Sequence, residues 1–171
     1  MKTKIAEFSK VPYGQWEKDL RKITDAITED CVVDLYNQIK LPKRATTGSA
    51  GYDIYATYGF TLAPGDSILI PTGIRCDIDE GWFLAIYPRS GLGFKYFCRL
   101  ANDVGICDED YAFSNNEGHI MVKLRNEGDK DLTINRGDGI AQGILQPYGI
   151  IYNDNADGIR NGGFGSTGGA Q

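Results

Sequence analysis

The sequence predicts an all-β domain, an antiparallel sandwich or jelly roll, with a short helix before it and a flexible arm after it. From about residue 48 onward, short apolar runs recur with turn residues between them, which is typical of many short antiparallel strands. They do not alternate with long helical stretches, so a parallel βαβ fold is disfavoured. The length of 171 residues fits one such domain with terminal extensions.

Residues 1–40 are expected to form an N-terminal extension that contains the helix. Between residues 11 and 30, apolar side chains recur at helical spacing, and Pro12 suits a first helical turn. The apolar residues are Trp16, Leu20, Ile23 and Ile27. The charged face, made of Glu17, Lys18, Asp19, Arg21 and Lys22, has no basic bias. We therefore expect a helix that packs on the core, and disfavour a membrane-surface or partner-binding helix.

The β domain is expected to span residues 41–152. Its clearest strands are 68–70, 82–87, 120–122 and 140–145. The turns that separate them are rich in glycine, proline, asparagine and aspartate, and lie at 64–66, 79–81, 126–128 and 135–138. No internal repeat is evident.

Residues 153–171 are expected to form a C-terminal arm. Its abundant glycine predicts a flexible tail. The arm also carries a cation, an aromatic ring and hydroxyl groups, in Arg160, Phe164, Ser166 and Thr167. A mobile arm that becomes ordered on a nucleotide phosphate needs this mixture.

Composition excludes several classes of function. The net charge is −5, and no basic stripe is present, which disfavours nucleic-acid binding. No apolar run reaches membrane-spanning length, and the first residues lack the apolar core of a signal peptide, so a cytoplasmic protein is expected. The four cysteines are widely spaced, which predicts reduced, partly buried thiols and no zinc site.

Two segments are candidates for chemistry. Arg89, Ser90 and Gly91 follow the most apolar strand and can present a guanidinium, a hydroxyl and an open backbone N–H to a phosphate group, although any β-turn can contain Ser-Gly. Residues 102–111 hold four carboxylates and no basic residue, which usually indicates a solvated acidic loop. Here the apolar residues before Asp108 place it beside a half-buried hairpin, where a carboxylate can act as a general base on water.

These segments belong to a set of five that resembles the trimeric dUTPase family, of the bacterial or phage type with an N-terminal extension. In chain order the similar segments are residues 50–56, 88–91, 102–111 with 118–121, 137–142, and 162–168. The resemblance implies a dUTPase-like β-clip, a distorted jelly-roll barrel. It also implies a homotrimeric dUTP diphosphatase that cuts dUTP to dUMP and pyrophosphate, which keeps uracil out of DNA and supplies dUMP for thymidylate synthesis.

The same resemblance implies roles for individual residues. Asp108 is the base that activates the water attacking the α-phosphorus, and Tyr111 stacks under the deoxyribose and rejects a 2′-hydroxyl. The uracil pocket is formed by Asn102, Gly105, Ile106, Cys107 and Met121. The phosphates are held by Arg89, Ser90 and Gly91, with assistance from Gln142. The cofactor is Mg²⁺, chelated by phosphate oxygens and waters, with Asp53 reaching it at most through water.

The fifth segment resembles the family's C-terminal arm, which closes over a neighbouring subunit's site. This implies that Phe164 stacks on uracil and that Arg160, Gly165, Ser166 and Thr167 lie near the γ-phosphate. Closure of such an arm would expel water and complete the site.

Three features depart from the family pattern. The arginine of the fifth segment is one place nearer the phenylalanine, at Arg160 instead of position 159, and Gly139 stands where the fourth segment usually has an arginine. Residues 112–117 are an insertion. It is expected to be a surface loop, or alternatively to shape subunit contacts or the pocket rim.

Two alternatives to the dUTPase function remain. A dCTP deaminase shares the fold, but Arg89-Ser90 runs into Gly91, where that family typically continues with another serine. The second is a phage-type protein in which this fold binds a regulatory partner and catalysis is secondary; the insertion and the N-terminal helix favour it.

Overall fold

The computed structural model describes residues 3–24, 26–160 and 162. Its strands are β1 (Ala6–Lys10), β2 (Tyr52–Tyr55), β3 (Phe60–Leu62), β4 (Ser67–Pro71), β5 (Ile74–Ile78), β6 (Trp82–Pro88), β7 (Cys98–Leu100), β8 (Gly105–Cys107), β9 (Met121–Asn126), β10 (Leu132–Ile134) and β11 (Gly139–Pro147). Its helices are α1 (Tyr13–Ile23), α2 (Glu29–Asn37), α3 (Ser90–Tyr96) and the 3-10 helix η1 (Glu109–Phe113).

The strands form small antiparallel sheets, and the predicted all-β class is confirmed. One sheet has the order β2-β11-β6-β8 and another the order β4-β9-β7, while β1 pairs with β5 and β10 pairs with β3. The pairings among the described residues are all antiparallel. β11 lies between β2 and β6, so segments distant in the sequence become neighbours at its two edges.

The predicted N-terminal helix is present but shorter than residues 11–30, because α1 ends at Ile23 and a second helix, α2, begins at Glu29. α1 ends at Ile23, and Thr24 has an extended backbone with φ −148°. Thr28, also extended, precedes α2. Both threonines are β-branched, which lowers their helix propensity and favours a break. Ile27 continues the apolar spacing because it too packs against the core.

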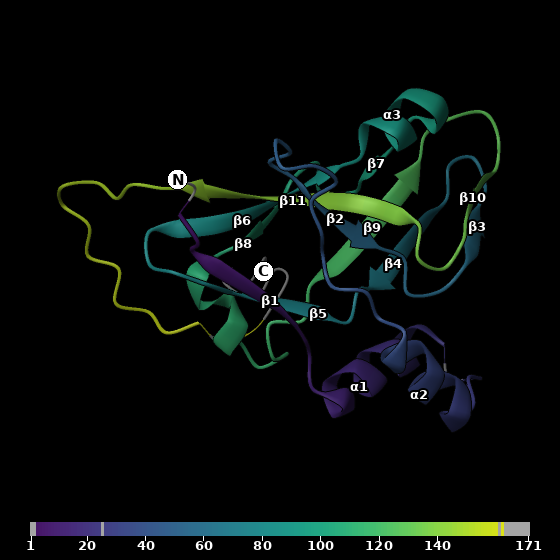
Figure 1. Ribbon diagram of the computed structural model, residues 1–171, viewed down its shortest axis with the longest axis horizontal. Coiled ribbons are helices and arrows are strands. Elements are labelled where there is room, and N and C mark those ends of the chain that lie inside the picture. Colours follow the sequence, from purple (N-terminus) through teal and green to yellow (C-terminus); the bar gives the residue numbers. More distant parts are fainter. Residues whose placement is uncertain (1–2, 25, 161, 163–171) are drawn as a thin grey trace, which may run out of the picture.

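The N-terminal residues share the core of the β domain. Trp16 and Leu20 of α1 and Val32 of α2 are buried in the same cluster as Leu84 and Ile140. β1 adds a strand beside β5, which the sequence did not predict. Figure 1 shows α1 and α2 together below the sheets, with α3 on the opposite side. The packing role expected for the helix is therefore correct.

One charged residue of α1 does not lie on the solvated face to which the sequence assigned it. Asp19 is buried, because its carboxylate turns inward and accepts hydrogen bonds from neighbours on α1 and from the loop before β9. A buried carboxylate is stable only when such partners are present.

All four cysteines are free, as predicted. Burial raises the pKa of Cys76 and Cys107 to about 12 and that of Cys98 to about 11, so these thiols stay protonated and unreactive. Cys31 is exposed. Within the described part of the chain, we find no helix that is long and apolar enough to cross a membrane.

Candidate active site

Arg89 stands where β6 passes into α3, and its guanidinium faces β2 and β11. Its Nε lies 3.1 Å from Oδ1 of Asp53 on β2, and its Nη1 donates to the carbonyl oxygen of Gly139 at 3.2 Å. The sheet order brings these residues together, because β11 is the single strand between β2 and β6. The guanidinium is thus held in one place, where it can meet an anion in a fixed orientation.

Gln142 lies on β11 directly between two site strands. It is opposite Asp53 on β2 and opposite Tyr87 on β6. Its Nε2 donates to the carbonyl oxygen of Pro88 at 3.1 Å. A Cβ at Gly51 would come within 2.6 Å of the Gln142 Oε1 atom, so the backbone before β2 approaches this side chain as closely as only glycine allows.

Gly139, where the resemblance led us to expect an arginine, makes room for Arg89. A Cβ at this position would lie 2.3 Å from Nη1 of Arg89 and 2.7 Å from its Cζ. Any side chain at position 139 would therefore push the Arg89 guanidinium away from Asp53. In this chain the absence of a side chain at position 139 leaves this space to the Arg89 guanidinium.

The residues after Arg89 form a helix, α3, which the sequence analysis did not predict. A hollow of about 400 Å³ is lined by Arg89, Ser90, Gly91, Leu92, Lys95 and Tyr96. Lys95 was missed in the sequence. Its position on the helix that begins at Ser90 brings a second positive charge to the hollow, and only the helical conformation reveals this.

The residues assigned to a base pocket do come together. Asn102, Gly105, Ile106, Cys107 and Met121 line one small hollow with Ile86, Leu100, Val122 and Lys123. Gly105 lies against β6, and a Cβ there would be 3.2 Å from Cβ of Ile86. The hollow measures about 10 Å³, which suffices for about one water molecule. A pyrimidine ring therefore fits only when a flanking side chain moves, and Ile106 is exposed and able to do so.

Asp108 follows this hairpin and precedes η1. Its side chain is 49% exposed, so solvent reaches the carboxylate. Arg160 forms an ion pair with Asp108 through Nη2 and a second one with Asp110, whose Oδ1 lies 2.6 Å from its Nε. The resemblance placed Arg160 near the γ-phosphate. In this structure Arg160 instead pairs with Asp108, the residue that the resemblance assigned as the base.

Tyr111 forms the wall beside these charges. Its ring is buried, with one face toward the Arg160 guanidinium at 5.7 Å from the ring centroid. Its hydroxyl points inward and donates to the carbonyl oxygen of His119 at 2.8 Å. Burial raises the pKa of Tyr111 to about 12, so this hydroxyl remains protonated at neutral pH.

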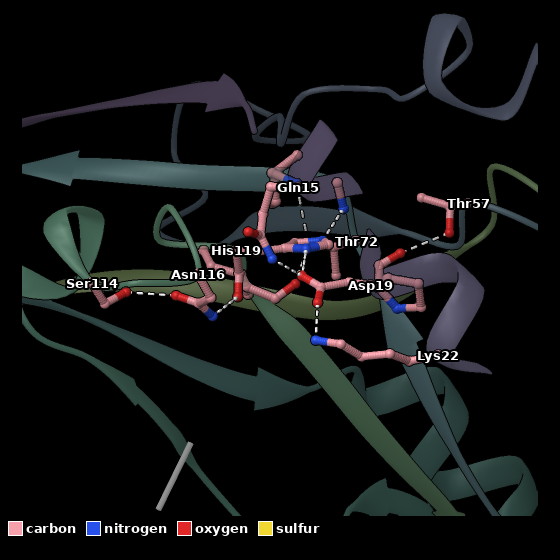
Figure 2. A network of polar contacts seen from close by, with 12 residues as sticks. Gln15, Asp19, Lys22, Thr57, Thr72, Ser114, Asn116 and His119 are labelled. Carbon is pink, nitrogen blue, oxygen red and sulfur yellow. Dashed lines mark hydrogen bonds and ion pairs between the residues drawn. The ribbon is translucent and has the colours of Figure 1, made fainter. Parts of the chain in front are cut away.

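The insertion is more than a surface loop. Ala112 and Ser114 are buried, and Asn116 donates through Nδ2 to the Tyr111 hydroxyl at 2.9 Å. Figure 2 shows Asn116 and Ser114 on one side of His119 and the residues of α1 on the other. His119 is the single histidine of the chain, and the sequence gave no sign of this network because Asp19 and Gly73, which hold its ring, are far from it in the chain.

The two groups of candidate residues lie at opposite ends of β6. Cys107 is opposite Leu84 in the pairing of β8 with β6, so Asp108 is near the start of β6, whereas Arg89 follows its end. At about 3.3 Å per residue, these points are roughly 20 Å apart along the strand. In Figure 1, η1 is the green turn at lower left and α3 is at upper right. One chain therefore presents two separate half-sites.

Four residues assigned to the arm, Phe164, Gly165, Ser166 and Thr167, lie outside the described residues.

Comparison with known proteins identifies a family. The dUTPase family model matches residues 37–168. The deoxyuridine 5′-triphosphate nucleotidohydrolase of Lactococcus lactis subsp. lactis is 41% identical over 134 residues, which cover 76% of this chain and 89% of that protein. The corresponding protein of Hahella chejuensis is 42% identical over 144 residues, 78% of this chain and 90% of that protein.

Solved structures agree. The crystal structure of dUTPase from Streptococcus mutans superimposes with a TM-score of 0.61 at 30% identity, over 84% of this chain and 97% of that one. A variant dUTPase from phage phi11 of S. aureus, described with a structural Mg(II) ion, gives a TM-score of 0.63 at 17% identity, over 91% and 98% of the two chains. At that identity the likeness concerns the fold, which confirms the predicted jelly-roll class.

Proposed function

The chain belongs to the dUTPase family, and from that premise we propose that it hydrolyses dUTP to dUMP and pyrophosphate with a water molecule activated by Asp108. The observation that carries this proposal is the position of Asp108: a solvent-accessible carboxylate directly after the hairpin hollow and three residues before Tyr111. A base bound in the hollow would leave its sugar near Tyr111 and its phosphates near Asp108.

In the proposed step, the Asp108 carboxylate accepts a proton from water as the water oxygen attacks the α-phosphorus. The bond from that phosphorus to the bridging oxygen breaks, and pyrophosphate leaves with the electron pair. In this step the Arg160 guanidinium would move away from Asp108, because it now contacts the Oδ2 atom, to which the attacking water could donate. The incoming phosphates would compete for Arg160, since phosphate is also a strong guanidinium partner.

The Tyr111 ring is proposed to be the surface on which the sugar rests. Its hydroxyl is turned inward and Arg160 covers one face of the ring, so this face would meet the sugar once Arg160 moves to the phosphates. A ring that offers no hydrogen-bond partner to a 2′-hydroxyl and leaves it no space would favour the deoxyribonucleotide.

Mg²⁺ is proposed to enter with the substrate. Within the part of the chain that the structure describes, no group of three or more His, Cys, Asp or Glu side chains could hold a metal ion. The nearest carboxylate to Arg89 is that of Asp53, which is engaged in its ion pair. These residues fit an ion chelated by the triphosphate and waters, with Asp53 contacting it at most through water. When bound, the ion would neutralise phosphate charge and orient the triphosphate.

The complete site is proposed to form between copies of the chain in a homotrimer. Arg89 and Asp108 lie at opposite ends of one strand, so a second copy has to supply the missing half. Exposed apolar side chains flank both half-sites: Phe94 and Phe97 beside Arg89, and Ile106 beside Asp108. Such side chains are typical of an interface core. The arm would then exchange between subunits.

Subunit complementation tests this proposal. Asp108→Asn alone should lower kcat for dUTP by about 10²–10⁴, and Arg89→Ala alone should also be severely impaired because it lacks the fixed phosphate partner. When the two variants are mixed under conditions of subunit exchange, a cyclic trimer with shared sites regenerates about a quarter of the intact sites.

The control and the substrates decide the outcome. Asp110→Asn removes a neighbouring carboxylate that also pairs with Arg160 and should retain most of the activity. Pyrophosphate release is measured with dUTP, UTP, dTTP and dCTP. Full activity of Asp108→Asn would refute the role of this base, absence of rescue would refute the shared site, and ammonia from dCTP would indicate a deaminase.

A cytoplasmic location belongs to the same proposal. The regulatory protein partner, for which the N-terminal helix and the insertion were the sequence support, stays a prediction.

A further inference from the structure

A buried polar network joins α1 through His119 to Asn116 and Ser114 of the insertion (Figure 2), and it ends on the hydroxyl of Tyr111. At its centre is His119, the only histidine of the chain, whose side chain is fully buried. The backbone N–H of Gly73 donates to its Nε2 at 2.9 Å, and its Nδ1 lies 2.8 Å from Oδ2 of Asp19. Because a backbone N–H can only donate, Nε2 is the acceptor and Nδ1 carries the proton given to Asp19. The ring is thus neutral and held from both sides.

Asp19 anchors this ring to α1. Its carboxylate also accepts from Nε2 of Gln15 at 2.6 Å and from Nζ of Lys22 at 2.7 Å. Burial opposes ionisation, but the hydrogen bonds from His119, Lys22 and Gln15 outweigh it and hold the pKa of Asp19 well below its usual range. Asp19 is therefore an ionised carboxylate held by three hydrogen-bond donors.

The backbone of His119 carries the network to Tyr111. The His119 carbonyl oxygen accepts from the Tyr111 hydroxyl at 2.8 Å and from Nδ2 of Asn116 at 3.2 Å. Asn116 also donates to the Tyr111 hydroxyl at 2.9 Å, so this hydroxyl both donates and accepts. Ser114 in turn donates to Oδ1 of Asn116 at 2.5 Å, which fixes the orientation of the amide. The place of the Tyr111 ring is therefore determined by His119 and Asn116.

We infer that Asp19, His119 and Asn116 are positioning residues for Tyr111, so that α1 and the insertion take part in discrimination between deoxyribose and ribose. This inference rests on the proposed function, in which the Tyr111 ring supports the sugar. Asp19 and His119 are buried and have no access to a nucleotide, so they act through the bond of the Tyr111 hydroxyl to the His119 carbonyl oxygen.

The expected effect is on selectivity more than on rate. Exclusion of one hydroxyl group depends on the position of the wall to within a fraction of an ångström, and a loosened ring leaves room for it. Proton transfer to Asp108 depends on the triphosphate and the attacking water, whose positions the ring affects less. Weakening of the network should therefore raise activity toward UTP relative to dUTP.

The test uses Asn116→Ala and Asp19→Asn, with kcat/KM measured for dUTP and for UTP. Each variant should lower the dUTP-to-UTP selectivity about 3–10-fold, with kcat for dUTP within about threefold of wild type. Tyr111→Phe, which keeps the ring and removes the hydroxyl, should lower selectivity similarly. Addition of Asn116→Ala to Tyr111→Phe should have little further effect, because both act through the same hydroxyl.

Leu20→Ala is the matched control. Leu20 is buried on the same helix but takes no part in the network, so its truncation should lower Tm and leave the selectivity unchanged. A fall in Tm for Asn116→Ala and Asp19→Asn without a change in selectivity would refute the inference. If Asp19→Asn does not fold, the additivity of Asn116→Ala and Tyr111→Phe decides, since full additivity would equally refute it. If the wild type shows no preference for dUTP over UTP, the proposed function fails instead.

Discussion

At the scale of single residues, the chain places polar groups where their charge state matters to folding. Asp19 looks in the sequence like one of several charges on the solvated face of a helix. In the structure it is a buried acceptor for His119, Gln15 and Lys22. Removal of its charge would leave these donors less well satisfied, and an unpaired buried donor is expensive.

Stability should therefore depend on the ionisation of Asp19. The pKa of Asp19 in the folded chain is lowered from the ordinary value of 3.8. As the pH falls, the carboxylate is therefore protonated in the unfolded chain before it is protonated in the folded chain. The stabilisation is complete above about pH 5 and is lost progressively below about pH 4. Urea unfolding at pH 7 and at pH 3 should show Asp19→Asn less stable than wild type at pH 7, with a smaller difference at pH 3. An equal difference at both pH values would contradict this assignment.

At the scale of elements, turn geometry ties the insertion to the site. Gly118 closes the insertion with φ +70°, a left-handed conformation that favours glycine. A Cβ there would come within 2.7 Å of Cα of Ala112, next to Tyr111. The return of the chain toward β9 is therefore packed against η1, which is why the insertion becomes part of the network under Tyr111.

Gly118→Ala should destabilise the protein by about 2–4 kcal/mol, because backbone strain and a steric clash add. Gly65→Ala is the matched control. Gly65 has φ +84°, but nothing lies within 4 Å of the added Cβ. Gly65→Ala should therefore cost only the backbone strain, about 1–2 kcal/mol, without a steric clash. The free energies of unfolding from urea titration compare the two. Equal losses would indicate that the backbone near Ala112 yields to the new methyl group.

At the scale of the whole molecule, Arg89 and Asp108 are far apart along β6. We therefore expect activity to require assembly of several copies of the chain. The side chain of Phe94 on α3 is 88% exposed beside Arg89. A phenylalanine in that position is unfavourable in water and is well suited to an anchor between subunits.

Phe94→Asp should weaken assembly at least about tenfold, and activity at low protein concentration should fall with it. Sedimentation velocity and pyrophosphate release measured over a range of protein concentrations would show whether the two fall together. Val33→Asp, at a half-exposed position of α2 away from both half-sites, should change neither. An unchanged trimer that has lost activity would place Phe94 in the site and not in the interface.

The sequence by itself determined the class of fold and located four of the eleven described strands, β4, β6, β9 and β11, while the roles it gave to site residues stay predictions. Such predictions depend on local information, namely apolar spacing, turn residues and short motifs such as the residues around Asp108. Arg89, Asp53 and Gln142 were predicted separately, and the sheet brought them together.

Only the tertiary structure decided what lies behind and between these residues. The burial of Asp19 against His119 and the approach of Arg89 to Gly139 depend on contacts between distant segments, and the support of Tyr111 by His119 and Asn116 depends on the folding of the insertion. Such contacts leave no periodicity in the sequence, because each is fixed by how the sheets and helices pack. The same packing places Asp108 and Arg89 at opposite ends of one strand.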